Sequence, residues 1–457
     1  MPSDQRQLEI SFERDPLIST LLNSGSFAVF AELSPYGGDS QQEGGVSPKA
    51  AEFAAALESA RSGRGLAFLP RLSRTASVRQ LRAVRTLASA PFLFCLSGAS
   101  ATPRHLQEDA ANARTAGFCN FLATTGRLRR SEDGQVVPYV DSVEILDALA
   151  DPHKSQTLAA CVTPFVYTPE AQCAQYAKLL RKLAHGAQFI VAQAGWDMAK
   201  YQEMQWFLQQ RELVVPIVVR LRFVTPEEAG RLRGGLEPGV AVPLSVAARL
   251  ERLQSQPGEF RAYQRELAAL MAVGCRKLGY SGILLSGLED GAEATAFLEM
   301  LARLEGEVES FDAWLTRWEA FTAGGSMIPA TRRALEAPFY LFSNLLTREL
   351  PFYDRQASRF TRQSVSEPPW LESFRASLFA PGARGALPRL ARTLFPRCAE
   401  RSRSYGLDVS ACPKRLTGGA CCGVQPDGLC EDGQCSCLYG LLAQLAVSRN
   451  ELYLLED

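Results

Sequence analysis

The stretch Thr168-Pro-Glu-Ala-Gln-Cys-Ala-Gln-Tyr-Ala-Lys-Leu-Leu-Arg-Lys-Leu-Ala-His185, followed three residues later by Phe189-Ile-Val-Ala-Gln193, contains the unit from which the fold is predicted. Thr168 is placed to cap a helix, and Pro169 suits the first turn because that turn needs no donor from its backbone nitrogen. The apolar run that ends before Gln193 has the length of a buried strand. Helix and strand in this order are typical of a parallel sheet.

The same unit recurs along the chain from residue 26 onward. Each short apolar run is followed by a longer stretch with helical spacing, such as Ser77–Ala88, where apolar residues share one face. The eight runs are Phe27–Leu33, Leu66–Leu69, Phe92–Leu96, Phe121–Thr124, Thr157–Val162, Phe189–Ala192, Val214–Val219 and Ile283–Leu285. Eight strand–helix units over about 280 residues fit a closed (β/α)8 barrel better than an open doubly wound sheet.

In such a barrel, the residues at the carboxyl ends of the strands surround the active site. Glu32 is a carboxyl between two apolar neighbours, so it is poorly solvated and suited to deliver a proton; it could equally turn outward or pair with an arginine. Gln193 can both donate to and accept from a heterocycle, or it can cap the next helix. The Thr124-Thr125-Gly126-Arg127 turn could present backbone amides and a guanidinium to a phosphate or flavin edge.

The last sixty residues hold seven of the twelve cysteines, six of them in a glycine-rich run: Cys412, Cys421, Cys422, Cys430, Cys435 and Cys437. Glycine permits the tight turns that bring several thiolates to one ion, so the run predicts a metal or iron–sulfur site. A disulfide knot and a set of unconnected buried thiols are the alternatives. The first residues lack a secretory signal pattern, which favours a cytoplasmic protein and disfavours disulfides.

Composition narrows the classes of function. The 457 residues suggest two or three domains, and forty-nine basic residues balance forty-nine acidic ones. A neutral chain is not expected to bind nucleic acid through its overall field. No run of about eighteen apolar residues occurs, so no membrane span is expected. We expect a soluble, cytoplasmic protein.

Four segments resemble, in order and spacing, the flavin-dependent methylenetetrahydrofolate reductases, whose fold is a (β/α)8 barrel. They are Phe-Ala-Glu32-Leu-Ser-Pro35, Lys182-Leu-Ala-His-Gly-Ala-Gln-Phe-Ile-Val-Ala-Gln193-Ala-Gly-Trp-Asp197, Val215-Pro216-Ile217 and Gly239-Val-Ala-Val-Pro243. The resemblance implies that Glu32 is the general acid and that Gln193 contacts the folate. It also implies that FAD or FMN contacts Thr124, Thr125, Gly126, Arg127, Arg181 and Lys182.

The chain departs from this family at several positions. Gly126-Arg127 stands where the family typically has Gly-Asp, and a cation beside the flavin pyrimidine would raise the reduction potential. The strand-three histidine is missing from Pro91–Ser97. These losses keep a second interpretation open, in which the barrel is a catalytically degenerate scaffold.

The C-terminal run resembles the cysteine-rich domain that is fused to, or partnered with, bacterial methylenetetrahydrofolate reductases, including those of acetogens. The resemblance implies ligands at Cys412, Cys421, Cys430 and one of Cys435 or Cys437, while Cys422 takes a usual glycine position. Zinc would act as a redox-inert clamp, and an iron–sulfur cluster as an electron port. The remaining cysteines are predicted to be small core residues: Cys95, Cys119, Cys161, Cys173 and Cys275.

Four regions are predicted: an N-terminal extension (1–25), the barrel (26–305), a proline-rich connector (306–397) with helices at Phe311–Phe321 and Thr331–Arg348, and the cysteine-rich domain (398–457). The expected reaction is flavin-dependent reduction of 5,10-methylenetetrahydrofolate to 5-methyltetrahydrofolate, with electrons from NAD(P)H or through the C-terminal cluster. The alternative is a scaffold or electron-transfer partner of a reductase or methyltransferase. An oligomer is expected in either case.

Overall fold

The computed structural model describes residues 15–36, 45–73, 76–151, 153, 155–233, 239–240, 242–322, 386–387, 390, 407, 411–433, 435–448 and 455. Among the helices in these ranges, none is both long enough and apolar enough to cross a membrane. The predicted helix at Thr331–Arg348 lies outside the described residues.

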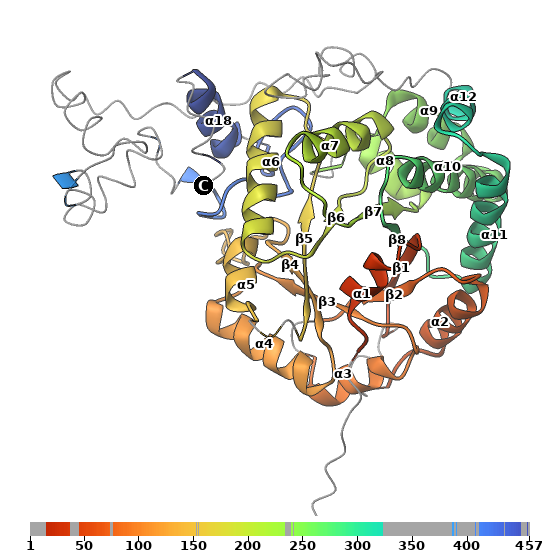
Figure 1. Cartoon of the computed structure of the whole chain (residues 1–457), viewed down its shortest axis with the longest axis horizontal. Helices are drawn as coiled ribbons and strands as arrows, with labels where there is room; N and C mark the ends of the chain where they lie inside the picture. The colour runs from red at the N-terminus through yellow and green to blue at the C-terminus, as the bar shows by residue number, and fades with distance from the viewer. Residues whose placement is uncertain are drawn as a thin grey trace, which may run out of the picture.

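Eight parallel strands form a (β/α)8 barrel, as predicted (Figure 1). Seven pairings run in the order β2-β1-β8-β7-β6-β5-β4-β3, and the bridge between Phe68 and Phe92 joins the two ends of this order. The strands are β1 (Ala28–Leu33), β2 (Leu66–Pro70), β3 (Leu93–Ser97), β4 (Asn120–Thr124), β5 (Thr157–Val162), β6 (Phe189–Ala192), β7 (Ile217–Arg222) and β8 (Gly282–Ser286).

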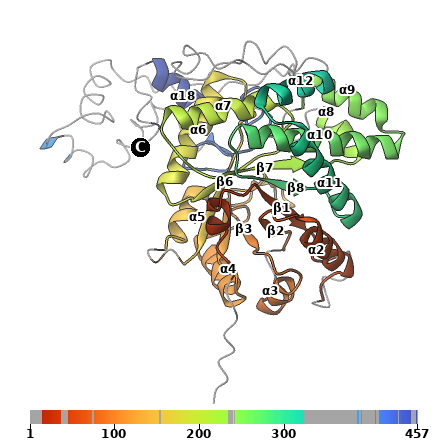
Figure 2. The same ribbon diagram turned by 45° about the vertical axis from the view of Figure 1, so that its right-hand side comes forward.

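Helices surround the strands, and Figure 2 shows α10, α11 and α12 side by side. Thr168 caps α6, because its hydroxyl accepts a hydrogen bond from the amide of Ala171 at 3.4 Å. The described helices are α1 (Ile18–Asn23), α2 (Pro48–Ala60), α3 (Val78–Arg85), α4 (Pro103–Thr115), α5 (Ser142–Ala148), α6 (Pro169–Ala184), α7 (Met198–Gln210), α8 (Pro226–Arg233), α9 (Leu244–Leu253), α10 (Pro257–Lys277), α11 (Gly291–Glu307), α12 (Phe311–Thr322) and α18 (Leu438–Ser448).

Alternate strand residues pack into two separate clusters, because successive side chains of a strand point to opposite faces. Ala28 and Phe30 of β1 lie in the cluster inside the barrel, whereas Val29 and Ala31 pack outward against the helices. The inner cluster is apolar from strand to strand. Glu32, which follows Phe30 by two positions, therefore belongs to the next layer inside the barrel, at the carboxyl end.

The seventh strand begins three residues later than predicted. The apolar run Val214–Val219 predicts a strand from its first residue, but β7 starts at Ile217 and extends to Arg222. Pro216 explains the difference, since proline lacks the amide that a ladder requires. Its carbonyl still accepts a hydrogen bond from the amide of Ile190 at 3.0 Å.

Helix α1 closes the opposite end of the barrel and lies across the centre of the ring of strands in Figure 1. Its residues Ile18 and Leu22 join the inner apolar cluster. The amide of Ile18 donates to Oδ1 of Asn120 at 2.9 Å, and Nδ2 of Asn120 donates to the carbonyl of Pro16 at 3.1 Å. The described end of the N-terminal extension is thus part of the barrel core.

The cysteine-rich segment packs on the barrel along α6. Helix α18 runs beside α6 (Figure 1), and buried residues of both elements share one apolar cluster. The amide of Tyr167 donates to the carbonyl of Pro426 at 2.8 Å, and Nε2 of Gln175 donates to the carbonyl of Cys421 at 2.7 Å. The segment is therefore seated on the face that carries the carboxyl end of β5.

The predicted helix Phe311–Phe321 is confirmed as α12, which packs on α10 through its buried tryptophans. Nε1 of Trp314 donates to the carbonyl of Leu270 at 2.8 Å. Gly274 lets the two helices approach, since a Cβ on this residue would lie 2.3 Å from Cζ2 of Trp314.

We predict that Gly274→Ala lowers the free energy of unfolding by about 1–3 kcal/mol, because the added methyl group overpacks the contact with Trp314. Urea unfolding followed by circular dichroism measures this change. Gly258→Ala in the same helix is the matched control, since a Cβ there meets no atom within 4 Å. Equal unfolding midpoints for the two variants would contradict the role assigned to Gly274.

Candidate functional site

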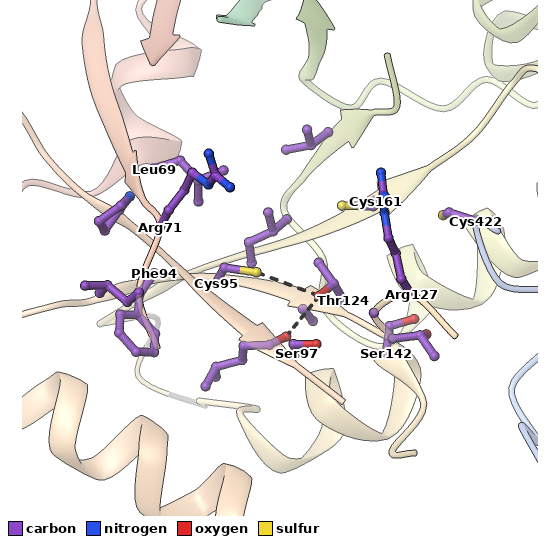
Figure 3. A pocket seen from close by; sticks show the side chains of 18 of the residues that line it. Leu69, Arg71, Phe94, Cys95, Ser97, Thr124, Arg127, Ser142, Cys161 and Cys422 are labelled. Carbon is purple, nitrogen blue, oxygen red and sulfur yellow. Dashed lines mark hydrogen bonds between the residues drawn. The ribbon is translucent and has the colours of Figure 1, made fainter. Parts of the chain in front are cut away.

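A cavity of about 400 Å³ opens at the carboxyl ends of the strands (Figure 3). All eight strands or the residues that directly follow them contribute to its lining. The predicted residues Glu32, Gln193 and Lys182 line it, together with the turn Thr124–Arg127. Arg181 lies next to Lys182 on α6 but is not part of the lining. The cavity has the volume of a small-molecule site.

Arg220 connects the two residues singled out by the sequence. Its guanidinium forms an ion pair with Oε1 of Glu32, and its second terminal nitrogen donates to Oε1 of Gln193 at 3.4 Å. Glu32 faces the cavity and is paired with an arginine, as one sequence interpretation had it. The sequence places Arg220 at the end of its strand but does not predict that it meets Glu32, because the two residues lie 188 positions apart.

The backbone of Gln193 is fixed from behind. The hydroxyl of Tyr201 donates to the carbonyl of Gln193 at 3.0 Å, and the hydroxyl of Tyr280 donates to the carbonyl of Tyr201 at 2.8 Å. Burial raises the pKa of Tyr201 well above its usual range, so its hydroxyl keeps its proton. These two successive hydrogen bonds fix the backbone of Gln193, so its side chain stays at the cavity.

The turn after β4 packs tightly against the end of β3. Gly126 has a φ of +83°, and a Cβ there would lie 2.6 Å from Oγ of Ser97. The amide of Gly98 donates to the carbonyl of Thr124 at 2.8 Å. Only glycine fits this backbone without strain. The turn therefore presents Arg127 to the cavity from a fixed backbone (Figure 3).

Lys182 supports the end of β5. Its Nζ donates to the carbonyl of Cys161 at 2.5 Å, and its side chain is buried. The positive charge of Lys182 thus lies at the rim of the cavity, between α6 and β5.

Two predicted core cysteines line the cavity instead. Cys161 of β5 and Cys95 of β3 both face it, and Sγ of Cys95 lies 3.7 Å from Oγ1 of Thr124 (Figure 3). Burial, with the thiol of Cys422 adding to it, raises the pKa of Cys161 to about 12. These positions are wrong as core predictions, whereas Cys119, Cys173 and Cys275 are buried as expected.

The C-terminal segment forms one wall of the cavity through Cys422, Gly423 and Glu431. Oε1 of Glu431 accepts a hydrogen bond from the amide of Leu128 at 2.7 Å, and Nζ of Lys414 donates to the carbonyl of Gly126 at 2.7 Å. Lys414 and Glu431 also form an ion pair, with side chains 3% and 5% exposed. The sequence motif includes both residues but gave no signal of this contact.

A second buried ion pair joins Lys178 of α6 to Asp141 at the start of α5, beside the cysteine segment. Nζ of Lys178 lies 2.7 Å from Oδ2 of Asp141 and donates to the carbonyl of Gly419 at 3.1 Å. Gly419 has a φ of +113°, and a Cβ there would lie 3.2 Å from Cβ of Lys178. Gly419 therefore allows both a tight turn and a close approach of the segment to α6.

Cys430, Asp432 and Cys435 could hold a metal ion, because their ligand atoms all lie within 4.8 Å of one another. The amide of Cys430 donates to the carbonyl of Cys435 at 2.7 Å, which closes the turn that carries them. A hydrogen bond from Cys430 lowers the pKa of Cys435 and so favours its thiolate. Asp432 was not predicted, although it stands between two predicted ligands.

The other predicted ligands, Cys412, Cys421 and Cys437, are not part of this group. Burial raises the pKa of Cys412, Cys421 and Cys437, and the proximity of Cys430 adds to the shift in each case. The five predicted thiols thus lie in the same C-terminal segment, but only Cys430 and Cys435 belong to the group whose ligand atoms lie within 4.8 Å of one another. Cys422 is turned away from it, toward the cavity.

Comparison with known proteins places the barrel in a family. The sequence model of the family described as methylenetetrahydrofolate reductase matches residues 71–299, which is half of the chain. The chain belongs to this family. The matched range includes Gln193 and the β4 turn, but neither Glu32 nor the cysteine cluster.

Similarity to individual proteins is weaker. No curated protein sequence matches the chain. Among solved structures, an uncharacterized protein from Clostridium thermocellum, described as binding two copies of 5-methyl-5,6,7,8-tetrahydrofolic acid, has 12% identity and a TM-score of 0.43. That match covers 64% of this chain and 99% of the other.

We predict that Cys435→Ser weakens binding of zinc or iron at least about tenfold, since even the loss of a residue that only supports a ligand costs that much. Metal analysis after dialysis against a weak chelator measures this loss. Cys95→Ser is the matched control, because Cys95 lines the cavity and lies outside the cluster. Equal metal content in both variants would remove Cys435 from the ligand set.

Proposed function

We propose that the chain reduces 5,10-methylenetetrahydrofolate to 5-methyltetrahydrofolate with the help of a flavin, as an enzyme of one-carbon metabolism. The observation that carries the proposal is the meeting of Glu32 and Gln193, from distant parts of the chain, in the cavity of a barrel of this family. Together they offer a proton donor and a bidentate amide to one ligand.

The cavity fits a flat ring system. Its walls are apolar side chains of the strands, with polar groups at the rim: Leu69, Phe94, Leu96, Leu122, Val191 and Leu284 form the apolar part. Pockets of a few hundred cubic ångströms with convergent polar groups typically bind such ligands. A bound flavin would supply hydride transfer. Thr124, Thr125, Gly126, Arg127 and Lys182 would hold it at the rim.

Arg127 bears on the chemistry that a flavin could perform. A guanidinium beside the ring would stabilise its anionic reduced form, because opposite charges attract each other. The substitution relative to the family would then tune the reduction potential upward.

Glu32 is proposed to give its proton to the nitrogen that leaves the methylene carbon. Its Oε1 is held by Arg220, so substrate binding has to rearrange this pair, and the released carboxylate has to take up a proton from water, before Glu32 can act as the acid. Gln193 lies beside the same guanidinium and would orient the folate ring with its amide. Arg220 would therefore couple substrate orientation to release of the proton donor.

Two electron donors are compatible with this arrangement. A reduced nicotinamide nucleotide could enter the cavity, or an iron–sulfur cluster on Cys412, Cys421, Cys430 and one of Cys435 or Cys437 could deliver electrons through the adjoining wall. The sequence neighbours of two of these cysteines, Cys422 and Glu431, line the cavity. Zinc at the same thiols would leave only the nucleotide route.

One observation favours the alternative, a scaffold or electron-transfer partner without its own reductase activity. Glu431 and Lys414 already occupy the amide of Leu128 and the carbonyl of Gly126, which are backbone groups next to the proposed flavin turn. A scaffold would purify without flavin and would not oxidise a reduced nicotinamide nucleotide. Flavin absorption of the purified full-length chain separates the two functions.

We predict that Glu32→Gln lowers kcat by about 10²–10⁴-fold, because the amide cannot donate the proton that general acid catalysis requires. Stopped-flow oxidation of the photoreduced enzyme by methylenetetrahydrofolate measures this step. The variant should keep its flavin and its fold. Full activity in Glu32→Gln would exclude Glu32 as the general acid.

We predict that Gln193→Leu raises KM for the folate up to about tenfold and lowers kcat less. A net hydrogen bond contributes about 0.5–1.5 kcal/mol, and about 1.4 kcal/mol corresponds to a tenfold change in affinity. Steady-state kinetics with varied folate separates the two constants. An unchanged KM would show that the amide serves only the local backbone.

A further inference from the structure

Adjacent residues of the cysteine segment face opposite sides. Cys421 contacts Lys414 through its Sγ, and its neighbours Cys422 and Gly423 line the barrel cavity. Cys430 belongs to the metal-binding group with Asp432 and Cys435, and the next residue, Glu431, lines the cavity. A shift of either cysteine therefore moves a part of the cavity wall, because a single rigid peptide unit joins each cysteine to the next residue, which lines the cavity.

Lys414 contacts both sides at once. Its Nζ lies 3.8 Å from Sγ of Cys421, donates to the carbonyl of Gly126 at 2.7 Å and pairs with Glu431. The side chain is 3% exposed, so these partners replace water around the charge. The ammonium group of Lys414 thus contacts the thiol of Cys421, the β4 turn and the carboxylate that follows Cys430.

Glu431 completes the connection. Its Oε1 accepts the amide of Leu128 at 2.7 Å, and its Oε2 lies where a Cβ on Gly423 would be 2.2 Å away. The carboxylate of Glu431 therefore lies between the β4 turn and the backbone of Gly423. Tightly packed contacts of this kind transmit displacements instead of absorbing them.

Contacts with α6 anchor the segment independently of the thiols. Gln175 and Lys178 hold the carbonyls of Cys421 and Gly419 at 2.7 Å and 3.1 Å. These contacts involve no thiol, so we expect removal of a metal to leave the segment on α6 and to free only the side that carries the cluster. The expected consequence is a rearranged wall, not a detached domain.

We propose that Lys414 and Glu431 couple occupancy of the cysteine cluster to the conformation of the β4 turn, and thereby to ligand binding in the barrel cavity. The coupling deepens the proposed function, on which it rests for the folate ligand and for the metal. Linkage makes it reciprocal: if a filled cluster improves folate binding, bound folate must retain the metal by the same factor. A factor of about ten lies within the usual range for coupled sites.

Hydrogen exchange of the full-length chain tests the coupling without reference to activity. Removal of zinc or iron with a chelator is expected to speed exchange in the peptide covering residues 124–130 about tenfold, because the amide of Leu128 loses its fixed acceptor. Lys414→Met and Glu431→Gln should produce the same change with the metal in place. Arg104→Ala, which removes an exposed ion pair with Glu108, is the control and should leave the peptide unchanged.

Calorimetric titration with 5-methyltetrahydrofolate tests whether the cysteine cluster also affects ligand binding in the cavity. We expect about tenfold weaker binding after metal removal or in Lys414→Met, and about tenfold slower metal release to a chelator when the folate is present. Unchanged exchange at 124–130 after metal removal would overturn the coupling, as would a protein that binds neither zinc nor iron. A third outcome is that metal removal speeds exchange at 124–130 while the intact protein binds no folate. This outcome would support the coupling between cluster and turn and would contradict the proposed function.

Discussion

The pleat of a closed parallel barrel is the constraint on which the site depends. Side chains alternate between the interior and the helices, and all strands point the same way, so one layer of interior residues meets at one end. Glu32, Cys95, Cys161, Gln193 and Arg220 reach the same cavity only because each occupies an inward position near the end of its strand. A one-residue shift in any strand would turn its contribution to the helices.

Much of the barrel could be predicted because its signals are local. Apolar runs, a threonine cap such as Thr168 and the rhythm of helix and strand each depend on a few neighbouring residues. The start of β7 was missed for a local reason as well, since Pro216 interrupts an apolar run without changing its hydrophobicity. The contacts of the site are different. Arg220 with Glu32, and Glu431 with Leu128, join residues 188 and 303 positions apart.

Cysteine shows why residue type alone does not fix a role. A thiol packs like a small apolar side chain and also faces ligands, so a cysteine within an apolar strand fits both the core and a cavity. Cys275 is fully buried between α10 and its neighbours, whereas Cys95 and Cys161 lie a layer above the apolar interior. The layer of the barrel in which a cysteine lies decides between the two roles. That layer depends on strand register, which cannot be predicted from the local sequence.

The pair of Arg220 and Glu32 is more informative about ligand binding than about stability. Their side chains are 33% and 11% exposed, and an ion pair in such a place gains little over its desolvation cost. The buried Nε of Arg220 has no hydrogen-bond partner among the residues that the structure describes. A guanidinium with an unmet donor, beside a carboxylate and an amide at a cavity, is arranged to exchange its partners when a ligand enters. Because a partly buried ion pair contributes little to stability, ligand binding in the cavity explains the arginine better than stability does.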